Sequence, residues 1–188
     1  HRLWRKDSVR MAEGSPSKEM RSMVYTLSQD ILSRPAVKLS CDKVATICDT
    51  ARATLELSSS DKLFQLIETQ LVEHVRNFSR PVSVYHLARI LQALESWQMK
   101  NASELVEELG DCLETAVGDI RTESVSPGAV NSILRCAALL YGRDPKVMRP
   151  YWAFARRLFV NPAFLIGCSA RELSNFAWLT AFKAPWND

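Results

Sequence analysis

Apolar residues recur along this chain every three or four positions, which predicts a series of amphipathic helices. The first predicted helix covers 18–33 and ends ahead of Pro35, because the residue before a proline disfavours helical backbone. Its apolar face consists of Met20, Met23, Val24, Leu27 and Ile31. The alternating pattern of strands is nearly absent, so the sequence predicts an all-α fold.

One helical pattern occurs four times at a constant interval of 43 residues. Each copy opens with a serine placed four residues before the first apolar position: Ser40, Ser83, Ser126 and Ser169. A serine hydroxyl can accept a hydrogen bond from an unpaired backbone N–H group in the first turn, so we expect these serines to be N-caps. In the fourth copy Glu172 completes a capping box.

We call the four helices that follow these serines A helices. Their predicted core positions are Val44, Ile47, Cys48 and Ala51, then Leu87, Ile90, Leu91 and Leu94, then Val130, Ile133, Leu134 and Ala137, then Leu173, Phe176, Ala177 and Thr180. The opposite face carries the columns that begin at positions 42, 46 and 49 and recur at the same interval. We expect this second face to be exposed.

Between the A helices lie B helices, at roughly 61–78, 102–122 and 146–160, and the 43-residue interval continues through them. A repeated helix pair of this length is typical of an α-solenoid, in which each unit buries its apolar face against its neighbours. The sequence therefore predicts a single solenoid domain of antiparallel helix pairs. Its predicted parts are a flexible basic leader at 1–17 and a domain at 18–188 made of a B helix at 18–33, repeats at 40–78, 83–122 and 126–160, and a terminal A helix at 169–183.

The composition is that of a soluble globular protein, with 47% apolar and 24% charged residues and a net charge of +3. The five cysteines are far apart and include no CxxC pair, so we expect reduced core thiols rather than disulfides or a zinc site. No run of about eighteen apolar residues is present, and we therefore expect no membrane-spanning helix.

Catalytic signatures are missing from the sequence. It contains no glycine-rich phosphate loop, no GxSxG and no HExxH, so we expect neither an enzyme nor a bound cofactor. His74 stands in an otherwise apolar column and is interpreted as a packed core histidine.

The sequence of the fourth A helix is similar to a motif of a known repeat family. Its sequence, from Ser169 to Phe182, reads SARELSNFAWLTAF, and it resembles the A helices of the octotricopeptide family and its heptatricopeptide and RAP-associated relatives. The second and third copies keep the serine and the apolar positions but lack the Asn-x-x-Trp signature, and the interval here is several residues longer. The resemblance implies an organellar RNA-binding protein, mitochondrial or alternatively plastid, that binds ribosomal RNA or an organellar transcript.

If RNA is bound, repeated exposed positions on the A helices are where bases would be read. The column at 46 holds Thr46, Arg89, Ser132 and Asn175, and the column at 49 holds Asp49, Gln92, Arg135 and Trp178. Arginines and lysines would contact phosphates. The predicted RNA-binding residues are Arg80, Arg89, Gln92, Arg135, Arg143, Lys146, Arg149, Arg156, Arg157 and Asn175. Exposed helix positions are, however, also polar and variable in any soluble protein.

An acidic helix at 102–122 argues against RNA binding, because its many acidic residues are opposed by a single basic residue, Arg121, and should repel phosphate. The alternative is a HEAT-like scaffold that binds other protein subunits through this acidic helix and through a C-terminal edge containing Phe176 and Trp178. That edge is expected because no B helix follows the fourth A helix in the chain. For Trp178 we favour packing over an exposed aromatic surface. A regulatory module of a larger enzyme stays open as a third interpretation.

Overall fold

The computed structural model describes residues 16–34, 38–78, 82–99, 101–119, 125–142 and 144–183, with the side chains of 114–119 and 182–183 excepted. These residues form helices and no strand, which confirms the all-α prediction. The helices are α1 (Lys18–Leu32), α2 (Cys41–Thr54), α3 (Lys62–Arg76), α4 (Val84–Ser96), α5 (Ser103–Asp119), α6 (Pro127–Tyr141), α7 (Pro145–Phe159), α8 (Pro162–Ile166) and α9 (Ala170–Lys183). Most of the predicted leader, 1–15, lies outside the described residues.

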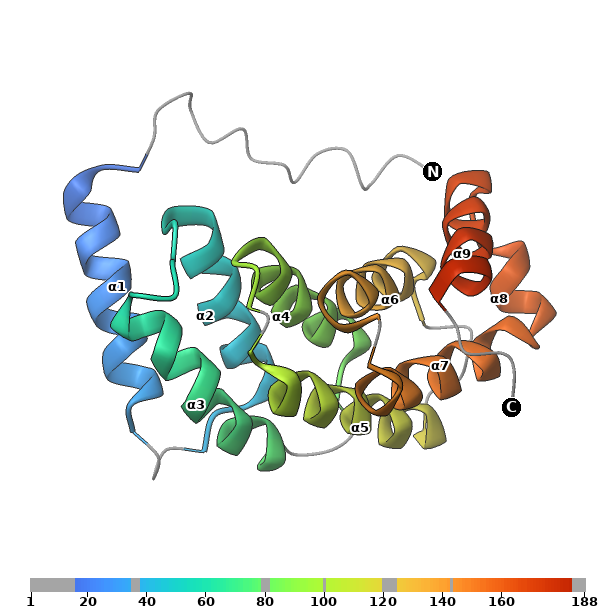
Figure 1. Cartoon of the computed structure of the whole chain (residues 1–188), viewed down its shortest axis with the longest axis horizontal. Helices are drawn as coiled ribbons and strands as arrows, with labels where there is room; N and C mark the ends of the chain where they lie inside the picture. Colours follow the sequence, from blue (N-terminus) through green and yellow to red (C-terminus); the bar gives the residue numbers. More distant parts are fainter. Residues whose placement is uncertain are drawn as a thin grey trace.

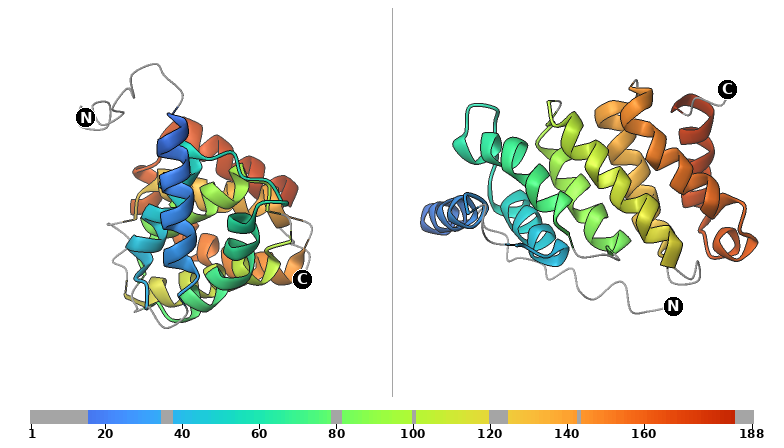
Figure 2. Two further views of the ribbon diagram at one scale, coloured as in Figure 1. Left: turned by 90° about the vertical axis from the view of Figure 1, so that its left-hand side faces the viewer. Right: turned by 90° about the horizontal axis from the view of Figure 1, so that it is seen from below.

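The helices form two layers (Figure 1). In one layer α1, α3, α5 and α7 contact one another in succession, and in the other α2, α4, α6 and α9 do the same. Figure 2 shows the helices lying side by side and following one another along the long axis of the molecule. The A helices α2, α4, α6 and α9 begin at Cys41, Val84, Pro127 and Ala170, which are spaced 43 residues apart.

The predicted core face is correct in three A helices and wrong in the last. In α2, α4 and α6 every predicted core position is buried except Ile47, which is half-buried. In α9, Phe176 is buried, whereas Leu173 is 41% exposed and Ala177 is also exposed. The reason is that α9 packs against α6, and the described residues contain no later helix that could cover Leu173.

The short helix α8 was not foreseen, since Asn161 and Pro162 resemble a simple connector. The Asn161 side chain accepts a hydrogen bond from the N–H of Ala163, and Pro162 occupies the first turn. These two residues therefore start a helix in place of a turn. Its Phe164 is buried against Phe159 and Phe176.

Three of the predicted capping serines, Ser40, Ser83 and Ser126, occupy the N-cap position but do not make the predicted hydrogen bond. None of their hydroxyls accepts from the first turn. Ser40 instead bonds the Asp42 carboxyl, which lowers the pKa of that group. In the fourth copy the capping box is complete, because Ser169 Oγ accepts from the Glu172 N–H at 3.3 Å and Glu172 accepts from the Ser169 N–H at 2.7 Å.

This difference among the serines predicts different effects of their removal. Ser169→Ala should lower the free energy of unfolding by about 1 kcal/mol, because it removes a side-chain cap. Ser126→Ala, where no such bond exists, should change it by only about 0.3 kcal/mol. Urea denaturation of both variants checks this, and equal losses would contradict it.

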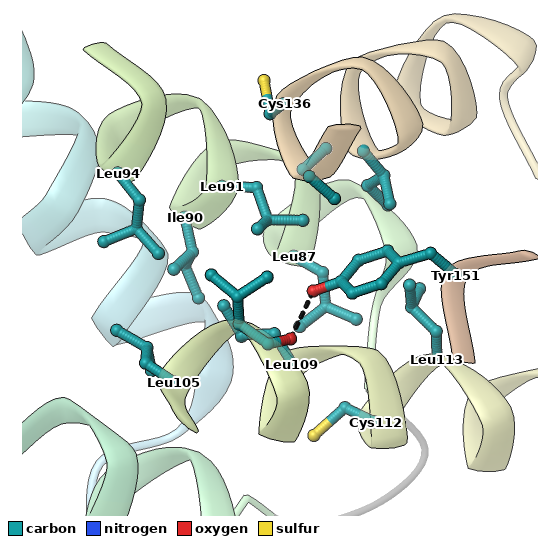
Figure 3. Packing of buried hydrophobic residues seen from close by; sticks show 14 of the residues in the cluster. Leu87, Ile90, Leu91, Leu94, Leu105, Leu109, Cys112, Leu113, Cys136 and Tyr151 are labelled. Atoms are coloured by element: carbon teal, nitrogen blue, oxygen red, sulfur yellow. Dashed lines mark hydrogen bonds between the residues drawn. The ribbon is translucent and has the colours of Figure 1, made fainter. Parts of the chain in front are cut away.

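The core is continuous through both layers. Around its centre lie Leu87, Ile90, Leu91 and Leu94 of α4 and Leu105, Leu109, Cys112 and Leu113 of α5 (Figure 3). The buried Tyr151 of α7 enters this cluster and donates its hydroxyl to the Val106 carbonyl at 2.5 Å. Desolvation raises the pKa of Tyr151 well above its ordinary value. Tyr151 therefore stays protonated and acts as a hydrogen-bond donor inside the core.

Hydrogen bonds between successive helices of one layer, or between the layers, recur along the molecule. Tyr141 donates its hydroxyl to the Met99 carbonyl at 3.0 Å, and Tyr25 accepts from the N–H of Leu63 at 3.3 Å. His74 is buried, with Nε2 3.5 Å from the Leu32 carbonyl, as predicted for a packed histidine. Each bond satisfies a polar group where a helix meets another helix or a connecting segment.

The cysteines lie in or beside the core, as predicted. Cys41, Cys48, Cys112 and Cys136 are buried, Cys168 is half-buried, and all five are free thiols. Desolvation raises the pKa of Cys41, Cys48 and Cys136 to about 12. These three thiols stay protonated and pack as small hydrophobic groups.

Helices α5 and α7 approach each other closely at a glycine. A Cβ atom on Gly110 would lie 2.5 Å from Cγ of Pro150 and 2.9 Å from Cε2 of Tyr151. Both neighbours are buried, so neither can move away freely. The absence of a side chain at Gly110 thus sets the distance between the two helices.

Gly110→Ala should consequently lower the free energy of unfolding by about 1–3 kcal/mol through overpacking. Gly128→Ala is the matched control, because its Cβ would meet only the Glu172 Oε1 atom, at 3.4 Å, and Ser126 Oγ, at 3.6 Å. That variant should be neutral or more stable by up to about 1 kcal/mol, since alanine favours helix more than glycine does. Guanidinium denaturation distinguishes them, and a Gly110→Ala variant as stable as the wild type would refute the close-approach argument.

Candidate nucleic-acid interface

The exposed face of the A layer is hollowed into a groove of about 580 Å³ whose lining comes from α2, α4, α6 and α9 and from the segment before α9. Pockets of this size hold small ligands. The groove is lined by Asp49, Arg52, Tyr85, Ala88, Arg89, Gln92, Ser126, Pro127, Gly128, Ala129, Ser132, Gly167 and Glu172. Asp49, Arg89, Gln92 and Ser132 belong to the two columns in which the sequence predicted base contacts. The groove thus brings together four of the eight residues of these columns.

Asp49 of α2 is the centre of the charged part of the groove. Its Oδ1 accepts from Arg52 Nη2 at 2.6 Å, and its Oδ2 accepts from Arg89 Nε at 3.2 Å and Nη2 at 3.0 Å. Arg52 lies one turn further along α2, whereas Arg89 belongs to α4. The carboxylate therefore joins two neighbouring A helices and fixes both guanidinium groups.

The pKa of Asp49 results from opposing effects. Burial raises it, but the hydrogen bonds and positive charges of Arg52 and Arg89 are stronger together and hold it below its ordinary value. Asp49 is consequently ionised at neutral pH. Because its pKa is lowered in the folded state, its contribution to stability is present above the ordinary value of about 3.9 and is lost as pH falls through the folded value.

Asp49→Asn should therefore destabilise the protein by about 1 kcal/mol at pH 7, since it removes a partly buried ionic interaction. The difference from the wild type should shrink as pH falls below about 4. Urea denaturation between pH 7 and pH 3 checks both statements. The exposed carboxylate of Glu56 provides a control, because Glu56→Gln should make little difference at any pH. A constant loss for Asp49→Asn across this range would contradict the account.

An aromatic ring stands beside this charged cluster. Tyr85 is 51% exposed, and the Arg89 guanidinium carbon lies 5.7 Å from its ring centroid, a cation–π contact. The His86 ring is also near, with 5.7 Å between the ring centroids. Tyr85 lines the groove, and so its ring is held in place without being covered.

The predicted cations of the third B helix lie in the other layer. Lys146, Arg149, Arg156 and Arg157 are all exposed on α7, which packs against α5. They cannot line the same groove as Arg89 and Gln92, because the groove opens on the A layer. The predicted RNA-binding residues therefore lie on more than one face of the molecule.

Basic side chains from neighbouring helices pair with the acidic side chains of α5. Arg76 of α3 donates to Glu104 and Glu108 of α5, at 2.7 Å each, and Lys146 of α7 lies 3.1 Å from Glu107. The expectation that these acids face only Arg121 is therefore wrong, since the sequence of one helix omits its neighbours. Arg121 itself lies outside the described residues.

The other predicted RNA-binding residues are scattered. Arg135 is exposed on α6 and Asn175 is half-buried on α9, and neither is among the residues that line the groove. Arg80 and Arg143 lie outside the described residues. Among the predicted residues, the groove brings together Arg89 and Gln92.

Of the two aromatic residues at the predicted C-terminal edge, one is buried and one is exposed. Phe176 is 4% exposed, because Phe159 and Phe164 cover it with ring centroids 4.9 Å and 6.2 Å away. Trp178, for which packing was favoured, is 48% exposed. Phe176 therefore belongs to the core and Trp178 to the surface.

Comparisons with protein-family models, curated proteins and solved structures found no match to this chain. Within the part of the chain that the structure describes, no cluster of side chains could hold a metal ion. In the same residues, no helix has the length and apolar character needed to cross a bilayer.

Sequence reasoning missed Tyr85, Arg52 and the pairing of Arg89 with Asp49. A usable signal was present for Tyr85, which falls in the exposed column that begins at position 42. Asp49 stands in the column at 49 of the first copy, and Arg89 stands in the column at 46 of the second. When these two helices pack side by side, the opposite charges can form an ion pair. The pattern of a single helix does not contain this information.

Proposed function

We propose that this chain is a non-catalytic RNA-binding α-solenoid with a 43-residue repeat. The equal spacing of the A-helix starts and the succession of contacts within each layer support the repeat. The observation that carries RNA binding is the groove, to which all four A helices, α2, α4, α6 and α9, contribute residues beside an exposed tyrosine. Protein surfaces that combine stacking aromatics with polar side chains are suited to unpaired bases.

The exposed cations of α7 would contact phosphates. Arg149, Arg156 and Arg157 follow one exposed side of that helix. Acids next to them would oppose phosphate, but the pairing of Glu104 and Glu108 with Arg76, and of Glu107 with Lys146, reduces the local negative charge. Phosphate contacts need charge rather than an ordered base geometry, and this surface supplies it.

The cellular role rests on the resemblance of the fourth A helix to octotricopeptide repeats. It favours an organellar ribonucleoprotein, such as a divergent mitochondrial ribosome in which the protein holds ribosomal RNA, with a plastid as the alternative location. No geometric feature of the chain adds to this part of the proposal.

Binding to a fluorescein-labelled single-stranded RNA, measured by anisotropy at several salt concentrations, tests the function. Replacing Arg149, Arg156 and Arg157 together with alanine should weaken binding and reduce the slope of log affinity against log salt by about 2, because each lost phosphate contact on a single strand contributes about 0.7. The control replaces Lys18, Lys38 and Lys62, exposed cations at the other end, with alanine. Equal losses in both triple variants would contradict a phosphate surface on α7.

A protein-binding scaffold is the second candidate. It is favoured by exposed apolar side chains at the two ends of the layers: Met20, Met23 and Leu27 on α1, and Val160, Ile166, Leu173 and Trp178 near α8 and α9. Such end surfaces suit protein partners. Ribonuclease treatment of the native particle separates the two functions, since an RNA-bound subunit should be released and a scaffold subunit retained.

A further inference from the structure

The groove on the A layer suits a neutral, flat ligand better than a phosphate. Its charged side chains are two guanidinium groups, Arg52 and Arg89, and two carboxylates, Asp49 and Glu172. Their formal charges cancel, and Asp49 already binds both arginines. A phosphate would have to compete with that carboxylate, whereas a nucleobase carries no charge.

Tyr85 provides a surface on which such a ligand can stack. Half of the residue is exposed, and it belongs to the groove lining. Arg89 holds the ring through its cation–π contact and is itself fixed by two hydrogen bonds to Asp49. A ring that is already held loses little freedom on binding, which favours affinity.

The groove also contains side chains that can meet the edge of a base. Gln92 of α4 and Ser132 of α6 both line it, and each of these side chains can donate as well as accept. The guanidinium of Arg89 has more N–H donors than the two bonded to Asp49. Base edges carry both donors and acceptors, so these groups match them.

We infer that the groove holds one unstacked nucleobase of single-stranded RNA, stacked on Tyr85 with its edge toward Gln92 and Ser132. This inference rests on the proposed function and adds the ligand and its orientation. The phosphates on either side of the base lie outside the charge-balanced groove. Recognition in the groove is thus by stacking and hydrogen bonding, and differs from the electrostatic contacts of α7.

The test measures binding of the full chain to fluorescein-labelled ten-nucleotide oligo(U), oligo(A) and oligo(C) by anisotropy. Tyr85→Ala should weaken binding roughly tenfold, the usual effect of removing one stacked base. Tyr85→Phe should retain affinity, because it keeps the aromatic face. Tyr85→Leu, which keeps apolar bulk without stacking, should behave like Tyr85→Ala. Met23→Ala removes a similarly exposed apolar side chain on α1, outside the groove, and should leave affinity unchanged.

A second variant tests the edge contacts separately. Gln92→Ala should reduce the ratio between the strongest and weakest of the three oligonucleotides, because that side chain faces the edge that differs among bases. If the wild type binds RNA but the Tyr85 variants bind equally well, the stacking site is overturned and RNA binding elsewhere stands. If the ratio is unchanged in Gln92→Ala, edge reading is overturned. If the wild type binds none of the oligonucleotides, the proposed function itself fails.

Discussion

Burial of each helix against its neighbour in the same layer is the constraint on which this structure depends. Helices α3, α5 and α7 and helices α4, α6 and α9 each pack on the preceding helix of their own layer. Stability is therefore shared between neighbours, and the two ends of the layers keep apolar side chains exposed. The same stacking brings the exposed columns of α2, α4 and α6 together, so the packing that stabilises the fold also creates the groove.

Polar groups at the contacts between neighbouring helices fix the position of one helix relative to the next. Tyr151 reaches from α7 to the backbone of α5, and Asp49 of α2 binds Arg89 of α4. Gly110 lets α5 and α7 approach closely. These contacts restrict sliding between neighbours, which a surface of aliphatic side chains alone would tolerate. A groove assembled from four helices needs that restriction, because a shift of α4 or α6 would separate Tyr85 from Ser132.

Local pattern was enough to predict the helices but not their partners. Periodicity located the starts of the A helices and the approximate bounds of the B helices, since apolar spacing is a property of each segment alone. It failed where a side chain contacts a neighbouring helix, as Arg76 does with Glu108, or where no neighbour covers a side chain, as at Leu173. The sequence predicted part of the groove. Arg89 and Gln92 were identified from their repeated exposed positions, whereas Tyr85 and the role of Asp49 became visible only with the helices packed side by side.

The central claim is that RNA contacts the A layer at the groove. Photo-crosslinking with an oligonucleotide containing 4-thiouridine, followed by mass spectrometry of the peptides, tests it most directly because it reports position. The account predicts crosslinks in peptides of α4 that contain Tyr85 or Gln92 and in the start of α6. Crosslinks confined to α7, or to the exposed ends of the layers, would contradict it.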